Sequence, residues 1–259
     1  MKKRSSLKIF FSVVKALLLR EIQTRFGSQK LGYLWAVVEP MATIIVFAII
    51  KELLHPNAMP GIDYPVFLAS GFVAYFMFKN IVVRSMSSFS ANKGLFVYKQ
   101  VKPFDTIISR ALLEFFLTVI IVILFLLIGW YLGFDVVPKN PLMVIVAYIW
   151  FAIFGLSLGI LFAVLGFFFQ NFSKIINLVF LPLFFISALF YTLDALPPIV
   201  RDILLLNPIV HFEEMIHANY FDGLSKEYYN YTYMALWTVM PMFLGLWLYK
   251  KTERKIIMS

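Results

Sequence analysis

Long apolar stretches alternate with short polar segments along most of the chain. A helix needs roughly 20 apolar residues to cross the hydrocarbon core of a bilayer, and six stretches reach about that length. They are Tyr33–Leu54, Tyr64–Val83, Thr106–Gly133, Leu142–Phe169, Ile175–Leu193 and Tyr231–Tyr249. The pattern therefore predicts an all-α polytopic membrane protein with six transmembrane helices.

The N-terminal segment, residues 1–30, is too charged to span the membrane. Lys8, Ser12 and Lys15 share one helical face, and apolar side chains cover most of the remaining surface. This pattern predicts an amphipathic helix in the cytoplasmic interface, with a frayed basic leader as the alternative. Because lysines interrupt the apolar run and no small-residue cleavage site follows it, we do not expect a cleaved signal peptide.

Residues 196–220 contain two apolar pieces that are divided by Asn207-Pro208. Each piece is too short to cross a bilayer and too apolar for a solvated loop. We expect a pair of short re-entrant helices that enter the outer leaflet just before the last span. Protein must cover the ends of such helices, because lipid offers no hydrogen-bond partners.

The composition agrees with a membrane location. Of the 259 residues, 61% are hydrophobic and 14% are charged, against about half and about a quarter in soluble domains. In a soluble protein the net charge of +9 would suggest a nucleic-acid partner. Here the cations gather in the N-terminal leader, after the second predicted span and in the C-terminal tail, which the positive-inside rule assigns to the cytoplasm. Both termini are therefore expected in the cytoplasm, and nucleic acid is not expected as a partner.

The sequence contains no pattern that is typical of catalysis, nucleotide binding or metal binding. Gly27 and Gly32 have the spacing that opens a Walker A loop, but Tyr33-Leu34 follows where that motif needs Lys-Ser/Thr. There is no cysteine, no HExxH motif and no GxSxG motif. Two histidines flank Glu214 at intervals of three residues, and interfacial polar residues are favoured there over a metal site. We expect no catalytic residue, metal or cofactor in this chain.

Charged residues inside the predicted spans need an explanation, because a charge in the bilayer is costly. Glu39, followed by Pro40, is either a pore-facing or gating group or a structural acid that bonds a neighbouring helix. Arg110 and Glu114 are four residues apart in the third span, which predicts a structural ion pair within one helix. Two pairs of glycines suit close helix packing: Gly129 with Gly133, and Gly155 with Gly159.

Four stretches carry a resemblance to a known family. LREIQTRFG at residues 19–27 and LGYLWAVVEP at residues 31–40 resemble the start of ABC-2 type polysaccharide-export permeases. The stretch from Asn92 to Glu114 is similar to the capsule-exporter branch, as is Asn207-Pro208-Ile209-Val210-His211. O-antigen and teichoic-acid permeases share the first stretch more loosely. The resemblance covers nearly the whole chain, in order.

The resemblance implies one subunit of an exporter rather than an enzyme. Residues 31–259 would form a single six-helix ABC-2 transmembrane domain in the bacterial inner membrane, with residues 84–104 as a cytoplasmic coupling loop. Family members form a homodimer that binds two copies of a cytoplasmic ABC ATPase, and the ATP and Mg sites are on that partner. The implied substrate is a lipid-anchored capsular polysaccharide. A periplasmic co-polymerase-type adaptor and an outer-membrane channel are the further implied partners.

Candidate site residues follow from this resemblance and from the pattern of aromatic and charged positions. Residues expected to couple to the ATPase are Leu95, Phe96, Tyr98 and Lys102. Residues expected to line or gate the translocation path are Tyr33, Trp35, Glu39 and Tyr75. Residues at the cytoplasmic mouth, which either attract a polyanion or reflect the positive-inside bias alone, are Arg20, Arg25 and Lys30. Residues expected to shape the outer gate are Pro208 and His211.

Three other functions stay open at this point. A permease for O-antigen or teichoic-acid precursors would share the same architecture. A membrane-embedded transferase acting on lipid-linked sugars would need a clustered acidic motif on a cytoplasmic loop, and none is present. A passive channel or scaffold would bind no nucleotide-hydrolysing partner.

Overall fold

The computed structural model describes residues 6–26, 32–54, 62–169 and 171–258. For Phe26, Gly32–Val37, Glu39, Lys51, Glu52 and Leu54 it describes the backbone alone. All regular elements in these ranges are helical. They are α1 (Ser6–Phe26), α2 (Gly32–Leu54), α3 (Tyr64–Met86), α4 (Ser88–Asn92), η1 (Lys93–Leu95), α5 (Pro103–Tyr131), α6 (Pro141–Phe168), α7 (Phe172–Phe185), η2 (Leu193–Ala195), α8 (Pro198–Leu204), α9 (Pro208–Tyr220) and α10 (Tyr231–Met258).

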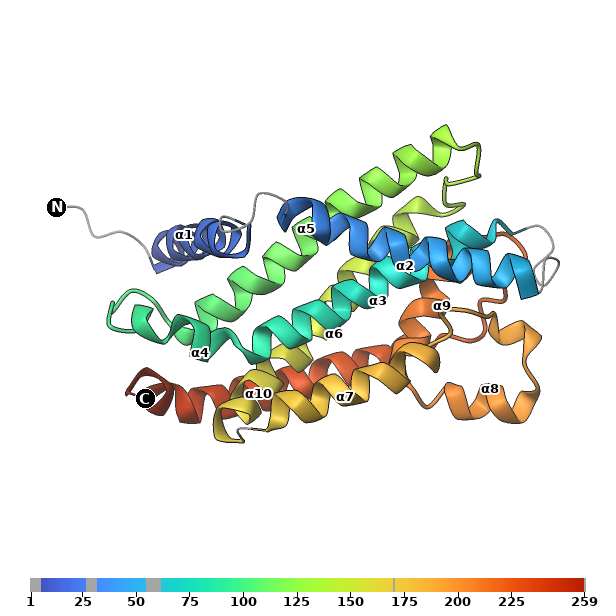
Figure 1. Cartoon of the computed structure of the whole chain (residues 1–259). Coiled ribbons are helices and arrows are strands. Elements are labelled where there is room, and N and C mark those ends of the chain that lie inside the picture. The colour runs from blue at the N-terminus through green and yellow to red at the C-terminus, as the bar shows by residue number, and fades with distance from the viewer. Residues whose placement is uncertain (1–5, 27–31, 55–61, 170, 259) are drawn as a thin grey trace.

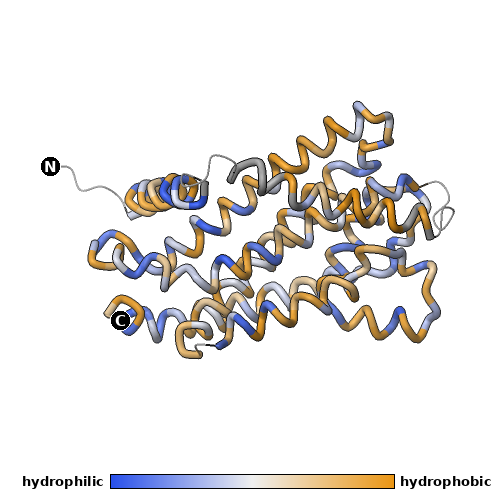
Figure 2. The backbone as a smooth tube through the Cα atoms, viewed as in Figure 1, coloured by the Kyte–Doolittle hydropathy of each residue, from blue (hydrophilic) through white to orange (hydrophobic). Residues whose placement is uncertain are grey.

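The all-helical class is confirmed, and four of the predicted spans correspond to long apolar helices. In the described ranges α3, α5, α6 and α10 are long and apolar enough to cross a membrane. The first predicted span coincides with α2, whose described apolar part is Pro40–Ile50. Figure 2 shows hydrophobic positions along the long helices and more hydrophilic positions towards the ends of the bundle.

The fifth predicted span, Ile175–Leu193, differs most from the structure. Helix α7 has 14 residues and ends at Phe185. Ala188 then takes a φ of 58°, a left-handed value at which an α-helix cannot continue. The rest of the predicted span is therefore irregular chain, and Leu193 begins the short helix η2.

The long helices lie side by side and leave two different ends (Figure 1). Helices α1 and α4 lie at one end of the bundle with the C-terminal part of α10, while α8 and α9 lie at the other. Helix α1 is seen nearly end-on, so it lies across the direction of the long helices. Helix α3 is central and packs against α2, α5, α6, α7 and α9.

Aromatic stacking and close glycine contacts hold the centre together. Phe78 of α3 stacks on Phe151 of α6 at 4.7 Å, and Phe151 stacks on Phe212 of α9 at 4.9 Å between ring centroids. Stacked aromatic pairs add to the free energy gained from apolar burial. A Cβ on Gly159 would lie 2.7 Å from the Ser85 hydroxyl oxygen, so a larger side chain would separate α6 from α3.

The predicted packing role is thus confirmed for Gly155 and Gly159, both of which face α3. It is wrong for Gly129 and Gly133. A Cβ on Gly129 would meet Val136, in the segment between α5 and α6, and Gly133 has a φ of 85° in the turn after α5. That pair of glycines shapes a turn instead of a helix interface.

Candidate functional site

Helix α1 is joined to α5 by two ion pairs that lie one helical turn apart. Glu21 Oε1 lies 2.7 Å from Arg110 Nε, and Arg25 pairs with Glu114. The predicted pair between Arg110 and Glu114 is therefore wrong. Each of these residues finds its opposite charge in α1, because α1 packs along α5 and brings residues 89 positions apart into contact.

Further hydrogen bonds extend this junction to α3 and α4. Arg110 donates to the Arg84 carbonyl and to the Ser87 hydroxyl, at 2.9 Å in each case. Arg20 donates to the Asn92 side-chain oxygen at 2.9 Å. The junction anchors α1 to the bundle, so a frayed leader does not describe Ser6–Phe26, which is helical throughout.

Two of the three cations predicted at the mouth are thus engaged within the chain. Arg20 binds Asn92 and Arg25 binds Glu114, while Lys30 lies outside the described residues. Their attraction for a polyanion stays a prediction.

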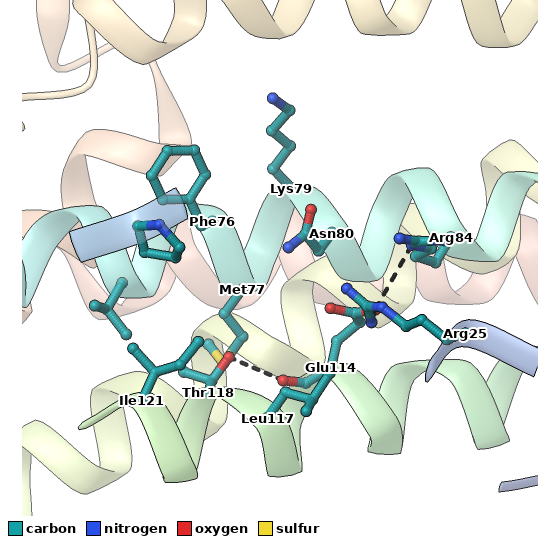
Figure 3. A pocket seen from close by; sticks show the side chains of 12 residues that line it. Arg25, Phe76, Met77, Lys79, Asn80, Arg84, Glu114, Leu117, Thr118 and Ile121 are labelled. Atoms are coloured by element: carbon teal, nitrogen blue, oxygen red, sulfur yellow. Dashed lines mark hydrogen bonds and ion pairs between the residues drawn. The ribbon is translucent and has the colours of Figure 1, made fainter. Parts of the chain in front are cut away.

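A polar cavity of about 250 Å³ opens beside this junction, between α2, α3 and α5. Figure 3 shows Arg25 and Arg84 turned towards Glu114, while Lys79 extends away from it. Asn80 and Thr118 add polar atoms to the lining, and the remaining lining residues are Pro40, Val73, Phe76, Met77, Leu117 and Ile121. The cavity is thus amphiphilic, with cations beside apolar walls.

Lys79 is a lining residue that the sequence patterns above do not single out. The signal for it is its position inside the second predicted span, since an ionisable residue in a transmembrane segment is a functional candidate by default.

A second concavity, a groove of about 760 Å³, lies between α1 and the loop that follows η1. Its walls on the α1 side are Ile9, Ser12, Val13, Ala16, Leu17 and Arg20. Its walls on the loop side are Leu95, Tyr98, Lys99, Gln100 and Val101. We call this concavity the loop groove.

The four predicted coupling residues take different positions around the loop groove. Leu95 and Tyr98 line it, and Tyr98 is 65% exposed. Phe96 points inward and packs in a cluster that includes Ile107. Lys102 is exposed and precedes α5, where its backbone N–H donates to the Asp105 carboxylate at 3.0 Å.

Val97, which the resemblance did not point to, is 83% exposed beside Tyr98. The exposed apolar pair on this loop is therefore Val97 and Tyr98. Phe96 and Leu95 instead connect the loop to the bundle and to the loop groove.

Tyr75, predicted on the translocation path, lies in the core. It is 1% exposed, and its hydroxyl donates to the Phe180 carbonyl of α7 at 2.7 Å. The side chains of Tyr33, Trp35 and Glu39 lie outside the described residues. The path role of all four residues stays a prediction.

Pro208 and His211 lie at the opposite end of the bundle, where α8, α9 and the start of α10 meet. Pro208 is the first residue of α9, and the Asn207 side chain caps that helix by accepting from the Ile209 N–H at 3.0 Å. His211 Nδ1 accepts from the Asn230 N–H at 3.1 Å. The other ring nitrogen must then carry the hydrogen, and it donates to the Leu205 carbonyl at 2.8 Å. His211 therefore ties three segments together.

Comparisons with known proteins find relatives along nearly the whole chain. Residues 12–221 match a family described as ABC-2 type transporter. The polysialic acid transport protein KpsM of Escherichia coli is 38% identical over 256 residues, which cover 99% of both chains.

Two further relatives carry capsule export in their names. The capsule polysaccharide export inner-membrane protein CtrC of Neisseria meningitidis serogroup B is 30% identical over 97% of this chain and 95% of its own. BexB of Haemophilus influenzae, named in the same way, is 28% identical over 98% of this chain and 96% of its own. With the apolar helices of the bundle, these matches identify a multi-pass membrane protein that belongs to the ABC-2 type transporter family.

Proposed function

We propose that this chain is the permease subunit of an ATP-driven exporter that moves a lipid-anchored capsular polysaccharide from the cytoplasm to the periplasm. The observation that carries the proposal is the similarity to KpsM along essentially the whole chain. CtrC and BexB, both named as inner-membrane proteins of capsule polysaccharide export, support the inner membrane as the location.

The proposed topology has six crossings and both termini in the cytoplasm. Helices α2 and α7 would add to the four long apolar helices. At 1.5 Å per residue, the 14 residues of α7 reach about 21 Å, short of the roughly 30 Å of hydrocarbon. The irregular chain after α7 would complete that crossing, because protein covers it: Ala188, Leu189 and Leu193 are 0% exposed.

The distribution of charge supports this orientation. The end of the bundle with α1 and α4 carries cations, among them Arg84, Lys93, Lys250, Lys251, Arg254 and Lys255. The other end carries carboxylates before α3, between α5 and α6, and after α9, namely Asp63, Asp135 and Asp222. The positive-inside rule assigns the first end to the cytoplasm. Helices α8 and α9 would then be the re-entrant pair on the periplasmic side.

The loop groove is the proposed docking site for the ATPase. It lies at the proposed cytoplasmic end, and Val97 and Tyr98 project beside it as an exposed apolar pair. A buried aromatic anchor at the centre of an interface commonly supplies much of the binding energy. Each of two copies would bind one ATPase, which carries the ATP and Mg sites. The chain itself would perform no catalysis, and the adaptor and the outer-membrane channel would complete the path.

Co-purification and cell fractionation test this function. The tagged chain should retain a nucleotide-binding subunit, and the complex should hydrolyse ATP in lipid. A deletion strain should accumulate capsular polymer in the cytoplasm. Accumulation of O-antigen or teichoic-acid precursors would instead identify the related permeases, and sugar transfer by the purified chain alone would identify a transferase.

A further inference from the structure

Among the described residues, the lining of the cavity between α2, α3 and α5 has more cations than carboxylates. Its lining contains three cations, Arg25, Lys79 and Arg84, and among the described lining residues one carboxylate, Glu114. Arg25 pairs with Glu114, and Arg84 Nε lies 3.7 Å from the same carboxylate oxygen. Among the described residues, a single carboxylate therefore faces two guanidinium groups, and these residues carry a surplus of positive charge.

Lys79 contributes most to this surplus. Among the described residues it forms no ion pair, and its ammonium lies 5.9 Å from the centre of the Phe76 ring, a weak contact. It extends away from Glu114 in Figure 3, so that carboxylate does not neutralise it. Lys79 also belongs to α3, a candidate membrane span. A cation at such a position is costly unless an anion or water accompanies it.

The side chains that line the cavity indicate which kind of anion could bind there. Guanidinium groups bind phosphate with two parallel hydrogen bonds, and an ammonium binds it as a point charge. The amide of Asn80 adds a donor, whereas Leu117 and Ile121 present apolar walls. The volume of about 250 Å³ is below the roughly 300–1,000 Å³ of sites for drug-sized ligands. That size suits a headgroup better than a length of polymer.

We propose that this cavity binds the phosphate group of an anionic lipid. The phosphate contacts Lys79, Asn80 and Arg84, and the acyl chains stay in the bilayer. Two sources share this chemistry: a phospholipid of the membrane and the lipid anchor of the exported polymer. The second source rests on the proposed function, and the first does not.

Lipid retention by the purified full-length chain tests the site. The chain is placed in nanodiscs of phosphatidylcholine with a minority of phosphatidylglycerol, and the lipids that stay bound after release from the disc are counted by native mass spectrometry. The wild-type chain should retain phosphatidylglycerol in preference to phosphatidylcholine. Lys79→Met should lower this retention about tenfold, the effect of losing one phosphate contact worth roughly 1.4 kcal/mol.

Matched variants separate a site from general attraction and from misfolding. Lys79→Arg keeps the charge and should retain the lipid. Lys93→Met removes an exposed cation of η1, which does not line the cavity, and should change nothing. Lys79→Gln provides the same comparison should Lys79→Met fail to fold. The proposal is overturned if folded Lys79→Met or Lys79→Gln retains phosphatidylglycerol as the wild type does, or if Lys93→Met loses as much.

Competition identifies the source of the phosphate. Soluble glycerol phosphate should leave retention unchanged, and displacement by it at equal concentration would overturn the requirement for a lipid. Lipid-linked glycan extracted from a strain without the exporter should displace phosphatidylglycerol if the site takes the polymer anchor. Without displacement, the site belongs to bilayer phospholipid. Lipid retention is measured without export. The result therefore tests the lipid site independently, even if the proposed export function is wrong.

Discussion

Arg110 of α5 binds Glu21 of α1, with 2.7 Å between Nε and Oε1, although the two residues are 89 positions apart. Both side chains are largely buried, with exposed fractions of 11% and 17%. Removing one partner of such a pair leaves the other charge without compensation, which is more costly than the loss of an exposed pair. The contact therefore fixes the position of α1, which forms one wall of the loop groove.

The first prediction concerns this ion pair. Glu21→Gln and Arg110→Met should each lower the thermal midpoint of unfolding in detergent. Each should lower the free energy of unfolding by about 3 kcal/mol. The double variant should lose less than the sum, with a coupling energy of about 0.5–3 kcal/mol. Lys139→Met is the control, since its pairs with Asp135 and Asp222 are exposed and should contribute little. Additive losses would show that the two charges act independently.

The second prediction distinguishes the exposed Tyr98 from the buried Phe96 in the loop after η1. Tyr98→Ala should abolish stimulation of the partner ATPase and leave the thermal midpoint unchanged, because the ring is 65% exposed. Phe96→Ala should lower stability by about 3–5 kcal/mol, because its ring is buried against Ile107. Unfolding scans and ATPase assays of reconstituted complexes measure both effects. Full ATPase coupling in Tyr98→Ala would remove this loop from the docking surface.

The third prediction uses the approach of α10 to α6. A Cβ on Gly245 would lie 2.8 Å from the backbone nitrogen of Leu161, which cannot rotate away. Gly245→Ala should therefore destabilise the chain by about 1–3 kcal/mol through overpacking. Gly166→Ala is the matched control, because its Cβ would meet atoms no closer than 3.9 Å. Equal thermal midpoints for the two variants would contradict the close contact.

The fourth prediction concerns His211. His211→Leu leaves the Asn230 N–H and the Leu205 carbonyl without their partner, at about 1–3 kcal/mol for each buried group. His211→Gln can both accept and donate, so it should lose less. Thermal unfolding compares the two variants, and export of polymer in cells reports whether the outer end still works. Identical losses of stability in His211→Leu and His211→Gln would mean that the shape of the ring, rather than its hydrogen bonds, stabilises this end of the bundle.

Periodicity and length predicted the helical class and the long helices well, because an apolar run long enough to span is a local property of the chain. The end of α7 was not predictable in this way. The left-handed backbone of Ala188 depends on the protein that surrounds it, where the residue is fully buried. The same holds for the turn that Gly133 permits.

The candidate site was harder to predict from the sequence than the fold. The spacing of Arg110 and Glu114 suggested a bond within one helix, yet both side chains turn to α1, whose position against α5 is a tertiary contact. Phe96 and Tyr98 have similar apolar character and lie two residues apart, but the turn after η1 directs one inward and leaves the other exposed. Lys79 was visible in the sequence, but the cavity that it lines is formed by residues of α1, α2, α3 and α5 together.

The glycine contacts on two sides of α6 also constrain how the protein can move. Gly159 brings α6 against the Ser85 side chain of α3, and Gly245 brings α10 against the Leu161 backbone of α6, and neither contact has room for a larger side chain. Helices packed this closely are expected to move together rather than past one another. On the proposed function, a movement that begins at the loop after η1 would then reach the end of the bundle with α8 and α9 through α3, α6 and α10 together.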